Sequence, residues 1–529
     1  MISVIIPARD AAGTLRACLD AVGAQRGLET SPEVIVVDDG SKDETAQIAE
    51  SHGARVIRRP AGGPAAARNA GARAARGAIL AFTDADCAPT PEWLKHLTGP
   101  FEDPRVVGVK GTYRTRQSGL IPRFVQAEYE HKYDRMARQT SIDFVDTSSA
   151  AYRREVFLQN GGFDTSFPVP SVEDQEFSFR LARKGYLMAF APDAVVEHLH
   201  DQNLAAYLRR KFGIGYWKAY MLRWLPEKAF SDSHTPASLR WQIGLLGLTA
   251  LAAVLAIGWP AALWVALAGL GLFYLTGLPF FWKIRGKDAG LLPAASLLLL
   301  ARAAALGAGL AVGFIAPPST SARREGGLSL GHRLAKRALD LVGATIGLIF
   351  SAPVVALAAV AIKLEGRGPV LFTQERAGEN GRPFRMLKLR TMVVGAEKQV
   401  GQVLAANPLS GPAFKIPDDP RVTRVGRVLR RWSVDEIPQL WNVLRGQMSL
   451  VGPRPEECWV VAQYDDRQRA RLAVKPGLTG PMQVNGRGGM DMEARLALEM
   501  DYIKKCSLWK DLSILFRSIP AVLSGRGAF

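Results

Sequence analysis

Cysteine is scarce in this chain of 529 residues: there are four, they lie far apart, and no two form a CxxC pair. This spacing argues against a disulfide framework and against a zinc site, and it fits a reducing compartment. The apolar run in the opening MISVIIPARD is too short for a signal peptide and lacks a basic leader, so no secretory signal is expected there. No internal repeat is visible, which leaves two to four ordinary domains as the expectation for this length.

Acidic residues are also in short supply, because 49 Asp and Glu face 67 Lys and Arg, which gives a formal net charge of +18. Such a surplus suits an anionic partner: phosphate, nucleic acid or an anionic membrane face. The basic residues cluster beside apolar blocks, as at a membrane surface, and no nucleic-acid motif is visible. We therefore expect a lipid bilayer and phosphate-bearing ligands as partners, and no nucleic acid.

The first 90 residues alternate between strand and helix patterns. SVIIPA, EVIVVDDGS, ARVIRRP and GAILAFTDADC read as strands, and the helices are expected at Ala11–Gln25, Lys42–Ser51 and Gly62–Arg76. This alternation predicts a mostly parallel, Rossmann-like α/β sheet covered by helices. Ligands on such sheets bind at the carboxyl ends of the strands, and the sequence places its acids there.

Two acids of the motif Asp84-Ala85-Asp86 are expected to bind a metal ion. In an extended chain, residues i and i+2 point the same way, so both carboxylates can converge on one Mg²⁺ or Mn²⁺. The ion would neutralise a diphosphate leaving group. A structural role is the alternative for this motif, because many turns contain one. In the same way, Asp38 and Asp39, which end the second strand, could cap the next helix instead of binding a ligand.

The motifs SVIIPARD, VIVVDDGSKDET, GPAAARNAGARAARG and ILAFTDADC occur in this order, and together they resemble the GT-A-fold inverting glycosyltransferases of family 2 over about residues 1–230. The resemblance implies nucleotide binding by Asp39 and metal binding by Asp84 and Asp86. It also suggests a catalytic base in SVEDQEFSFRLARKG, where Asp174 is the better candidate and Glu173 its neighbour. An alternative is that these are helix N-terminal acids favoured by the dipole.

VVEHLH offers His198 and His200, and either could complete the metal shell, although a core or surface role is equally open for each. Arg68 is a further candidate for binding the sugar nucleotide.

Apolar blocks follow this first domain. Trp241–Trp282 is broken by Gly258-Trp259-Pro260, and a single span needs about 20 residues, so the block holds two spans. Leu291–Ile315 is a further block, interrupted by Arg302. Leu341–Ile362 is the last, after a basic linker.

From Lys336 to Arg487 the chain resembles the bacterial sugar transferases, which are monotopic polyprenol-phosphate phosphoglycosyltransferases. The residues that carry this resemblance are KRALDLVGATIGLIFSAPVVALAAVAIKLEGRGPVLFTQERAGENGRPFRMLKLRTM, then DDPRVTRVGRVLRRWSVDEIPQLWNVLRGQMSLVGPRPE, then KPGLTGPMQVNGR. It implies that Asp435 is a nucleophile toward a nucleotide-diphosphate sugar and that Glu436 holds metal or manages a proton. Arginine forks suit phosphate oxygens, which explains why arginines flank these acids. A surface acid pair with salt bridges is the structural alternative.

The resemblance also supplies a set of residues for binding phosphates and a second metal ion. Mg²⁺ or Mn²⁺ is expected in both sites, with Asp435 as a ligand in the second. The candidate substrate-binding residues in this half are Lys388, Arg390, Arg421, Arg424, Arg431, Arg454, Gln483 and Arg487.

The membrane path follows from charge and proline. Basic residues flank Leu341–Ile362 on both sides, and Pro353 lacks a backbone donor, so we expect a re-entrant helix-break-helix hairpin over residues 337–363. Both active sites need cytoplasmic nucleotide sugars, so Leu291–Ile315 is expected not to cross, with Arg302 turned toward headgroups or protein. The alternative is that it spans and that Trp241–Trp282 contains one crossing plus an interfacial helix.

The expected plan is therefore a glycosyltransferase domain (1–230), membrane helices (231–316), a basic linker (317–335) and a phosphoglycosyltransferase domain (336–529), in a bacterial cytoplasmic membrane, as a monomer or a homodimer. The predicted function is bifunctional: a phosphosugar is transferred to polyprenol phosphate through a covalent aspartyl intermediate, and a second sugar is then added, at the start of bacterial glycan or exopolysaccharide synthesis. The alternative is that only the C-terminal half is catalytic and the N-terminal half is a binding or scaffolding module.

Overall fold

The structure, a computed structural model, describes the chain except residues 168, 317–329, 397–418, 486–491, 505 and 524–529. The chain forms two compact units, Met1–Gly313 and Phe314–Phe529, and each is described by itself. Most of the predicted basic linker (residues 317–329) and Arg487 lie outside the described residues.

The first unit begins with the predicted alternation of strands and helices. Strands β1, β2, β3 and β4 lie side by side and are parallel, so this half of the sheet is as predicted. Gly40 has a φ of +79°, and a Cβ there would lie 2.9 Å from the Ala61 backbone nitrogen, so the turn after β2 requires glycine. The bounds are β1 Ile2–Ala8, α1 Leu15–Gly23, β2 Glu33–Asp38, α2 Thr45–Ser51, β3 Arg55–Arg58, α3 Pro64–Ala74 and β4 Ile79–Phe82.

The other half of the sheet is mixed. The full strand order is β3-β2-β1-β4-β7-β6-β8-β5, and β7 and β5 pair antiparallel with their neighbours. Apolar side chains pack on both faces; Phe82 and Tyr152, for example, lie fully buried in one of the two cores. The remaining bounds are β5 Cys87–Pro89, α4 Trp93–Thr98, β6 Val106–Arg114, α5 Leu120–Met136, β7 Ala150–Arg153, α6 Arg154–Gln159, α7 Glu173–Arg183, β8 Leu187–His198 and α8 Leu204–Met221.

The metal-binding motif does not lie in an extended strand, which corrects the geometric basis of its prediction. Strand β4 ends at Phe82, and Asp84 to Cys87 form a turn closed by a hydrogen bond from the Cys87 N–H to the Asp84 carbonyl at 3.0 Å. Because the chain reverses here, Asp84 and Asp86 do not share one side of a strand, and each meets its own set of partners.

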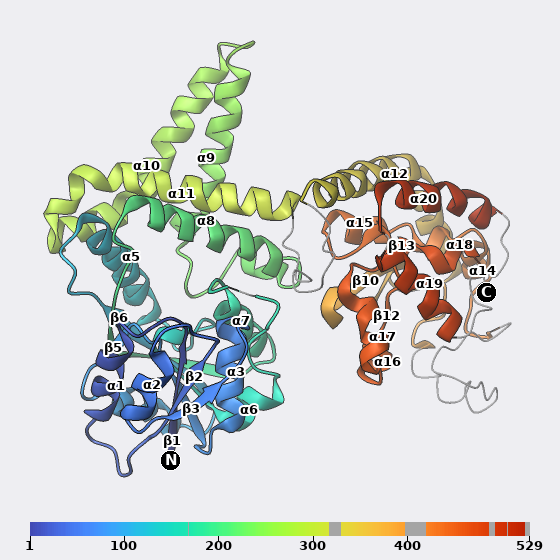
Figure 1. Cartoon of the computed structure of the whole chain (residues 1–529). Helices are drawn as coiled ribbons and strands as arrows, with labels where there is room; N and C mark the ends of the chain where they lie inside the picture. Colours follow the sequence, from blue (N-terminus) through green and yellow to red (C-terminus); the bar gives the residue numbers. More distant parts are fainter. Residues whose placement is uncertain (168, 317–329, 397–418, 486–491, 505, 524–529) are drawn as a thin grey trace. The chain divides into compact units, whose positions relative to one another are not determined.

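The apolar blocks form helices α9 (Ala237–Leu255), α10 (Ala262–Lys287) and α11 (Leu292–Ile315). In the described part of the chain, four helices, these three and α12 (Leu330–Glu365), are long and apolar enough to cross a membrane. Helices α9 and α10 form a projecting hairpin with many exposed apolar side chains, as expected for two spans separated at Gly258-Trp259-Pro260 (Figure 1).

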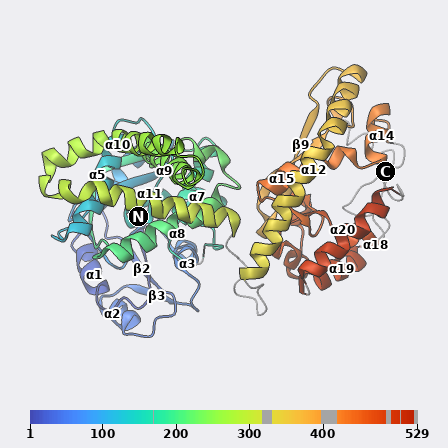
Figure 2. The same cartoon turned by 90° about the horizontal axis from the view of Figure 1, so that it is seen from above.

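Helix α11 packs along α8 of the first unit with unusually close backbone contact (Figures 1 and 2). A Cβ at Gly309 would lie 2.1 Å from the Phe212 carbonyl oxygen, and a Cβ at Gly313 would lie 2.4 Å from the Tyr216 carbonyl oxygen. Glycine is needed at both positions because the two helix backbones lie too close together to leave room for a side chain between them.

Arg302 of α11 points into protein, which confirms one of the two orientations predicted for it. Its guanidinium donates to Glu128 Oε1 of α5 at 2.7 Å and to Gln242 Oε1 of α9 at 2.7 Å. Lys211 of α8 donates to the other oxygen of Glu128 at 2.9 Å. The buried Glu128 carboxylate is thus paired with two cations, Arg302 and Lys211, as burial of a charge in an apolar setting requires.

The second unit holds a three-stranded sheet, β10-β9-β12, and a two-stranded sheet, β11-β13, surrounded by helices. Its longest element is α12, which is continuous through Pro353. The bounds are β9 Leu371–Ala377, β10 Pro383–Leu389, α14 Arg424–Arg431, η7 Val434–Glu436, α15 Gln439–Leu444, β11 Ser449–Val451, β12 Glu456–Glu457, α16 Cys458–Ala462, α17 Asp466–Arg469, β13 Gly477–Thr479, α18 Pro481–Asn485, α19 Met492–Lys504 and α20 Leu508–Leu523.

Both ends of α12 are held by the second unit. Near its start, Lys336 pairs with Asp511 at 2.7 Å, and Arg337 donates to the Val443 carbonyl at 2.7 Å. At its end, Glu365 accepts the Val425 N–H at 3.1 Å. The middle exposes apolar side chains, so α12 presents an apolar surface between two anchored ends. The residues around Pro353 stay helical, so the predicted helix break there is wrong, and the re-entrant path itself stays a prediction.

Candidate active sites

The first candidate site lies at the carboxyl ends of the parallel strands. Asp39, directly after β2, is 4% exposed, and its carboxylate accepts from the N–H groups of Gly62 and Gly63 at 2.8 and 2.7 Å and from Arg59 at 2.6 Å. These contacts fix the loop that precedes α3. The predicted role of Asp39 in nucleotide binding stays a prediction, since its oxygens serve this loop in the structure.

Arg68 of α3 brings two predicted site acids together from segments far apart in the chain. It donates to Asp84 Oδ1 at 2.7 Å and to Glu173 Oε1 at 3.1 Å, and Ser148 donates to Asp84 Oδ2 at 2.9 Å. Burial opposes ionisation of Asp84, but Arg68 outweighs it and lowers the pKa of that carboxyl. Both Asp84 oxygens are therefore engaged by protein groups.

Asp174, at the start of α7, differs from its neighbour Glu173. It is partly exposed, and the hydrogen bond it accepts is from the Gln175 N–H at 2.7 Å. Burial, followed by the charges of Glu173 and Asp146, raises the pKa of Asp174 well above its usual range. A carboxylate with a raised pKa and access to solvent suits proton transfer better than one held in an ion pair, which favours Asp174 over Glu173 as a base.

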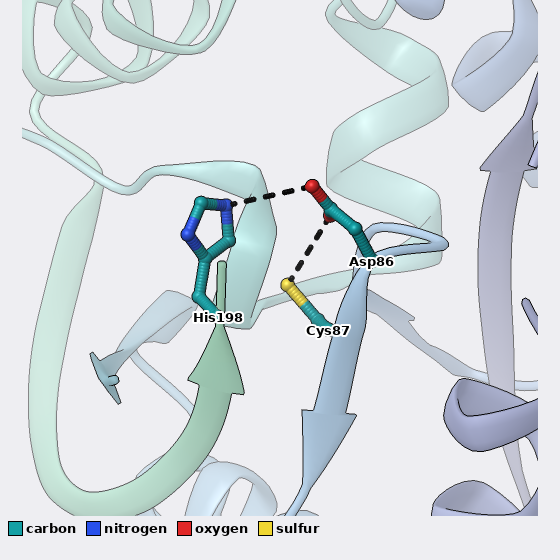
Figure 3. A group of neighbouring side chains, drawn as sticks. All are labelled: Asp86, Cys87 and His198. Atoms are coloured by element: carbon teal, nitrogen blue, oxygen red, sulfur yellow. Dashed lines mark hydrogen bonds and ion pairs between the residues drawn. The ribbon is translucent and has the colours of Figure 1, made fainter. Parts of the chain in front are cut away.

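Asp86 lies on the open side of the turn, close to His198 and Cys87 (Figure 3). Its Oδ2 is 4.0 Å from His198 Nε2, and its side chain is 45% exposed. Burial and the charge of Asp84 raise the pKa of Asp86. Asp86 and His198 thus face the same space, and these two residues fit a divalent cation that a diphosphate would complete.

His200 is buried away from this space, which favours His198 over His200 as the candidate ligand. It is 3% exposed, its Nδ1 lies 3.3 Å from His198 Nδ1, and its Nε2 lies 3.2 Å from Gln126 Oε1. Burial, with the neighbouring His198 and Arg210, lowers the pKa of His200 to about 3, so it is neutral. A neutral His200 that donates through Nε2 accepts at Nδ1, which leaves His198 Nε2 with a free lone pair.

The second candidate site is built around η7 in the second unit. Ser433 adopts a left-handed conformation with φ +54° and ψ +23°, and this bend turns the chain sharply between α14 and η7. Asp435, which follows, is 6% exposed, and Glu436 lies next to it.

The two acids of this site have opposite electrostatic environments. Glu436 Oε1 pairs with Lys388 and with Arg454, both at 3.1 Å, whereas Asp435 Oδ2 lies 3.9 Å from Lys388. Burial opposes ionisation of Glu436, but Arg454 and Lys388 lower its pKa to about 2. Burial raises the pKa of Asp435 to about 6, with Lys388 opposing and Glu436 adding to the shift. Asp435 is therefore the less neutralised carboxylate of the pair, and its predicted role as nucleophile stays a prediction.

Two residues that sequence reasoning missed line the pocket beside Glu436. Arg376 of β9 adds a third cation to Lys388 and Arg454. Gln439, at the start of α15, is 3% exposed, and its Nε2 has no hydrogen-bond partner among the described residues. A buried donor without a partner beside three cations fits an anionic ligand such as a diphosphate. Sequence alone offered no chemical signal for Gln439 beyond its closeness to Glu436 along the chain.

The other predicted phosphate-binding residues lie in several places. Arg390 donates to the carbonyls of Ile362, Gly366 and Arg367 at the end of α12, which is a structural position. Arg421 is paired with Asp419 at 2.6 Å. Gln483 has two buried polar atoms without a hydrogen-bond partner in the described chain. Arg424 and Arg431 lie in the first and last positions of α14, and Arg487 lies outside the described residues.

Comparison with known families finds a family match for a region in each unit. The bacterial sugar transferase family matches residues 331–525, and glycosyl transferase family 2 matches residues 3–161. The UDP-glucose:undecaprenyl-phosphate glucose-1-phosphate transferase of Caulobacter vibrioides is 47% identical over 206 residues, which are 37% of this chain and 72% of that protein. The exopolysaccharide production protein ExoY of Sinorhizobium fredii is 38% identical over 221 residues, 41% of this chain and 95% of that protein.

Other relatives are matched over less of their length. The galactosyl transferase CpsE of Streptococcus agalactiae serotype III is 42% identical over 198 residues, which are 37% of this chain and only 44% of that relative. Among solved structures, the mannosyltransferase PcManGT of Pyrobaculum calidifontis, in complex with GDP-Man and Mn²⁺, is 21% identical with a TM-score of 0.40, over 60% of this chain and 88% of that one.

The two matches follow the two units, with the GT-A fold in the first and the acid pair Asp435-Glu436 in the second. Through residues 331–525 the chain belongs to the bacterial sugar transferase family, and it carries a family 2 glycosyl transferase domain in front of them.

Proposed function

We propose that the chain is a bifunctional membrane enzyme that builds a lipid-linked disaccharide. Its second unit transfers a phosphosugar from a nucleotide-diphosphate sugar to polyprenol phosphate, and its first unit adds another sugar to that product. The observation that carries this proposal is the pair Asp435 and Glu436, in which Glu436 is neutralised by two cations and Asp435 is less neutralised and has a raised pKa. The named activities of the relatives, which use undecaprenyl phosphate and UDP-sugars, support the substrate classes.

In the first half-reaction, an Asp435 oxygen attacks the phosphorus that bears the sugar. The bond from this phosphorus to the bridging oxygen breaks, and nucleoside monophosphate leaves with that oxygen. In the second half-reaction, an oxygen of polyprenol phosphate attacks the aspartyl phosphosugar and releases Asp435 as a carboxylate. Covalent catalysis of this kind replaces one difficult displacement with two easier ones.

The cations of the site have a physical task in both half-reactions. A carboxylate that approaches a diphosphate meets like charge, and Lys388, Arg454 and Arg376 offset that repulsion from fixed positions. The Nε2 of Gln439 can donate to a phosphate oxygen. Asp435 would also hold a divalent cation shared with the substrate, since Mg²⁺ takes most of its ligands from water and phosphate; when bound, the ion supplies charge neutralisation.

In the first unit, Asp174 takes the proton of the acceptor hydroxyl as that oxygen attacks the anomeric carbon from the face opposite the diphosphate. The bond from that carbon to the diphosphate oxygen breaks, and configuration inverts. Asp86 and His198 would hold the divalent cation, which supplies neutralisation of the leaving diphosphate. Arg68 orients Asp84 and Glu173 beside this position.

The membrane path that fits two cytoplasmic sites is one hairpin plus two segments that do not cross. The hairpin α9–α10 goes out and returns, and the returning end is tied to the first unit where Lys287 pairs with Glu130 at 2.9 Å. The far end of α11 is also tied there, because Arg223 donates to the Gly313 carbonyl at 2.9 Å. With both ends of α11 beside one globular unit, α11 lies along the membrane interface. Helix α12 is anchored at both ends in the same way, which supports its re-entrant path.

A reconstitution experiment tests this function directly. Purified protein is incubated with polyprenol phosphate, Mg²⁺ and pairs of nucleotide sugars, and the lipid products are separated by mass. We expect a lipid diphosphate monosaccharide with one sugar and a disaccharide when the correct second sugar is added. A monosaccharide with every pair would make the N-terminal half a binding or scaffolding module. Absence of any lipid product with all sugars would contradict the proposal for the second unit.

A further inference from the structure

Arg454 reaches the second candidate site from a loop that has no regular secondary structure. Its side chain pairs with Glu436 at 3.1 Å and lines the pocket beside that acid. The loop, residues 452–455, runs from the end of β11 to the start of β12. Pro453 and Pro455, on either side of Arg454, have no backbone N–H with which to hold the loop. The position of the Arg454 guanidinium therefore depends on the residues that hold this loop from outside.

A buried arginine donates a hydrogen bond to the backbone of Arg454 itself. Arg471, in η8 (Ala470–Ala473), is 3% exposed, and its Nη2 donates to the Arg454 carbonyl at 3.2 Å. The same Nη2 donates to Glu499 Oε1 of α19 at 2.8 Å, and Nη1 donates to the Tyr464 hydroxyl at 2.5 Å. Because a guanidinium is planar, its contacts with Glu499 and Tyr464 fix the direction in which Nη2 points toward the Arg454 carbonyl.

Helix α19 also holds the far end of the loop. Arg495 pairs there with Glu456, the first residue of β12, and Arg495 Nε lies 3.4 Å from Glu499 Oε1. Glu499 is 1% exposed and faces both arginines, since Arg471 Nε lies 2.7 Å from its Oε2. The loop is thus held at Arg454 by one arginine and at Glu456 by the other, and Glu499 joins the two.

This cluster of two arginines and two glutamates calls for a reason other than stability. Replacing buried ion pairs with well-packed apolar side chains is often neutral or stabilising. Guanidinium groups, however, make directed hydrogen bonds that apolar packing cannot provide. In the described structure, the pocket beside Glu436 is lined by Arg454 but by none of the four charged residues of the cluster. Their effect on the reaction would therefore pass through Arg454.

We propose that Arg471 and Glu499 are positioning residues for phosphosugar transfer. By holding the Arg454 carbonyl, they keep the Arg454 guanidinium beside Glu436 and within reach of the diphosphate, where its charge offsets the repulsion between carboxylate and phosphate. Neither residue touches the substrate, and no bond forms or breaks at either. The inference rests on the proposed function of the second unit, since it concerns how Arg454 is held for that reaction.

A double-mutant cycle on the full chain tests this role. Phosphosugar transfer to polyprenol phosphate is measured for the native chain, Arg471→Lys, Arg454→Gln and the double variant. Lysine keeps the charge opposite Glu499 but lacks the planar fork, so kcat/KM should fall roughly 10- to 100-fold. In the Arg454→Gln background the same change should have less than about a twofold effect, because the residue through which it acts is gone. Equal losses in both backgrounds would overturn the proposal.

Two further measurements separate positioning from loss of folded protein. Arg471→Lys should raise KM for the nucleotide sugar as well as lower kcat, because Arg454 faces the diphosphate. A fall in kcat alone, matched by a smaller folded fraction in circular dichroism, would contradict the proposal. Arg337→Lys is the matched control, because Arg337 is also buried and donates to backbone carbonyls, those of Val443 and Leu444. Its loss, whatever its size, should be the same in both backgrounds.

Glu499→Gln keeps the cycle decisive if Arg471→Lys does not fold. This change keeps the size of the side chain and removes the charge that orients Arg471, so its effect should also vanish in the Arg454→Gln background. An additive cycle in an active chain would contradict the positioning role alone. Absence of transfer by the native chain would contradict the proposed function, and this inference with it, so the two failures are distinguishable.

Discussion

The two candidate active sites share one electrostatic arrangement of paired carboxylates, although they are built from different parts of the chain. In each, one carboxylate is neutralised by cations and has a lowered pKa, while a neighbouring carboxylate has a raised pKa. In the first unit these are Asp84 and Asp86, and in the second unit they are Glu436 and Asp435. Environments that push the pKa values of paired acids apart are how one site obtains two carboxylates with different tasks.

The difference between the sites lies in how far apart their residues are along the chain. Asp435 and Glu436 are adjacent, and the cations that flank them come from within about 60 residues. The first site needs Arg68 to join Asp84 to Glu173, and it needs the register of β5 and β8 to bring His198 to Asp86. The second site is therefore a local motif, and the first depends on the whole sheet. Variants that affect one site and spare the other test whether the two act independently.

The largest effect is expected from Asp435→Asn. Without the nucleophile, phosphosugar transfer to polyprenol phosphate should fall by at least about a thousandfold, and the sugar-phosphate adduct on the protein should disappear. Intact-protein mass spectrometry detects the adduct, and thin-layer separation of the lipids gives the rate. Asp465→Asn, which changes an exposed acid of the same unit, serves as the control. Near-normal turnover in Asp435→Asn would show that another residue is the nucleophile.

Asp86→Ala is expected to stop the second sugar transfer and leave the first intact, because the metal position of the first unit is lost while the second unit keeps its own. Lipid extracts should then contain the monosaccharide product alone. Asp193→Ala, at an exposed acid of β8, is the matched control. Loss of both activities in a folded Asp86→Ala protein would contradict independent sites, and loss of neither would make the first unit a binding module.

Sequence reasoning found the local parts of both sites and missed what depends on register or on packing. Asp435, Glu436 and Arg454 lie in one motif, and the structure brings them together. Asp84 was expected to share a cation with Asp86, but the strand ends at Phe82 and the turn gives each acid different partners.

Other parts could not be read from one sequence. His198 could not be placed beside Asp86 without the antiparallel pairing of β5 and β8. Gln439 has no chemical signature until burial shows that its amide lacks a partner. Arg390, expected at phosphate, instead donates to the carbonyls at the end of α12, a contact that only the fold creates.

Gln439→Leu sharpens the description of the second site. The change keeps the size of the side chain and removes the donor that faces the pocket, so phosphosugar transfer should fall roughly 10- to 100-fold. The first unit should still elongate a supplied monosaccharide lipid at an unchanged rate. Gln463→Leu, at an exposed glutamine of the same unit, controls for the substitution itself. Unchanged phosphosugar transfer would mean that Gln439 Nε2 does not contact the diphosphate.

A smaller effect is expected from pH. Asp435 must be ionised to attack, and its pKa is about 6, so the initial rate of adduct formation should fall roughly tenfold per pH unit below about 6. Glu436→Gln removes a negative charge that raises the pKa of Asp435 and frees Lys388, which lowers it. Both effects have the same sign, so the midpoint should move to lower pH. Rapid-quench measurements of the adduct between about pH 4.5 and about pH 8, a range that brackets the pKa of Asp435, test this. A midpoint that moves upward would contradict it.

The last prediction changes no rate and concerns where the two sites lie relative to the bilayer. Single cysteines are placed at Gly258, Lys287 and Ser321 in a chain whose own cysteines are replaced by serine, and intact cells are treated with an impermeant thiol reagent. Gly258 lies in the turn between α9 and α10 and should react from outside. A cysteine at position 287 should be protected, because the native Lys287 pairs with Glu130 and this position therefore lies beside the first unit on the cytoplasmic side.

Ser321 lies outside the described residues, but it follows α11 and so reports whether that helix crosses. Glycine contacts hold α11 along α8, and Arg223 holds the Gly313 carbonyl beside the first unit, so the end of α11 should stay on the side where α11 began. Ser321 is therefore expected to react only after the cells are permeabilised. Labelling of Ser321 from outside would mean that α11 spans the membrane, and the two active sites would then face opposite sides and could not share one cytoplasmic pool of nucleotide sugars.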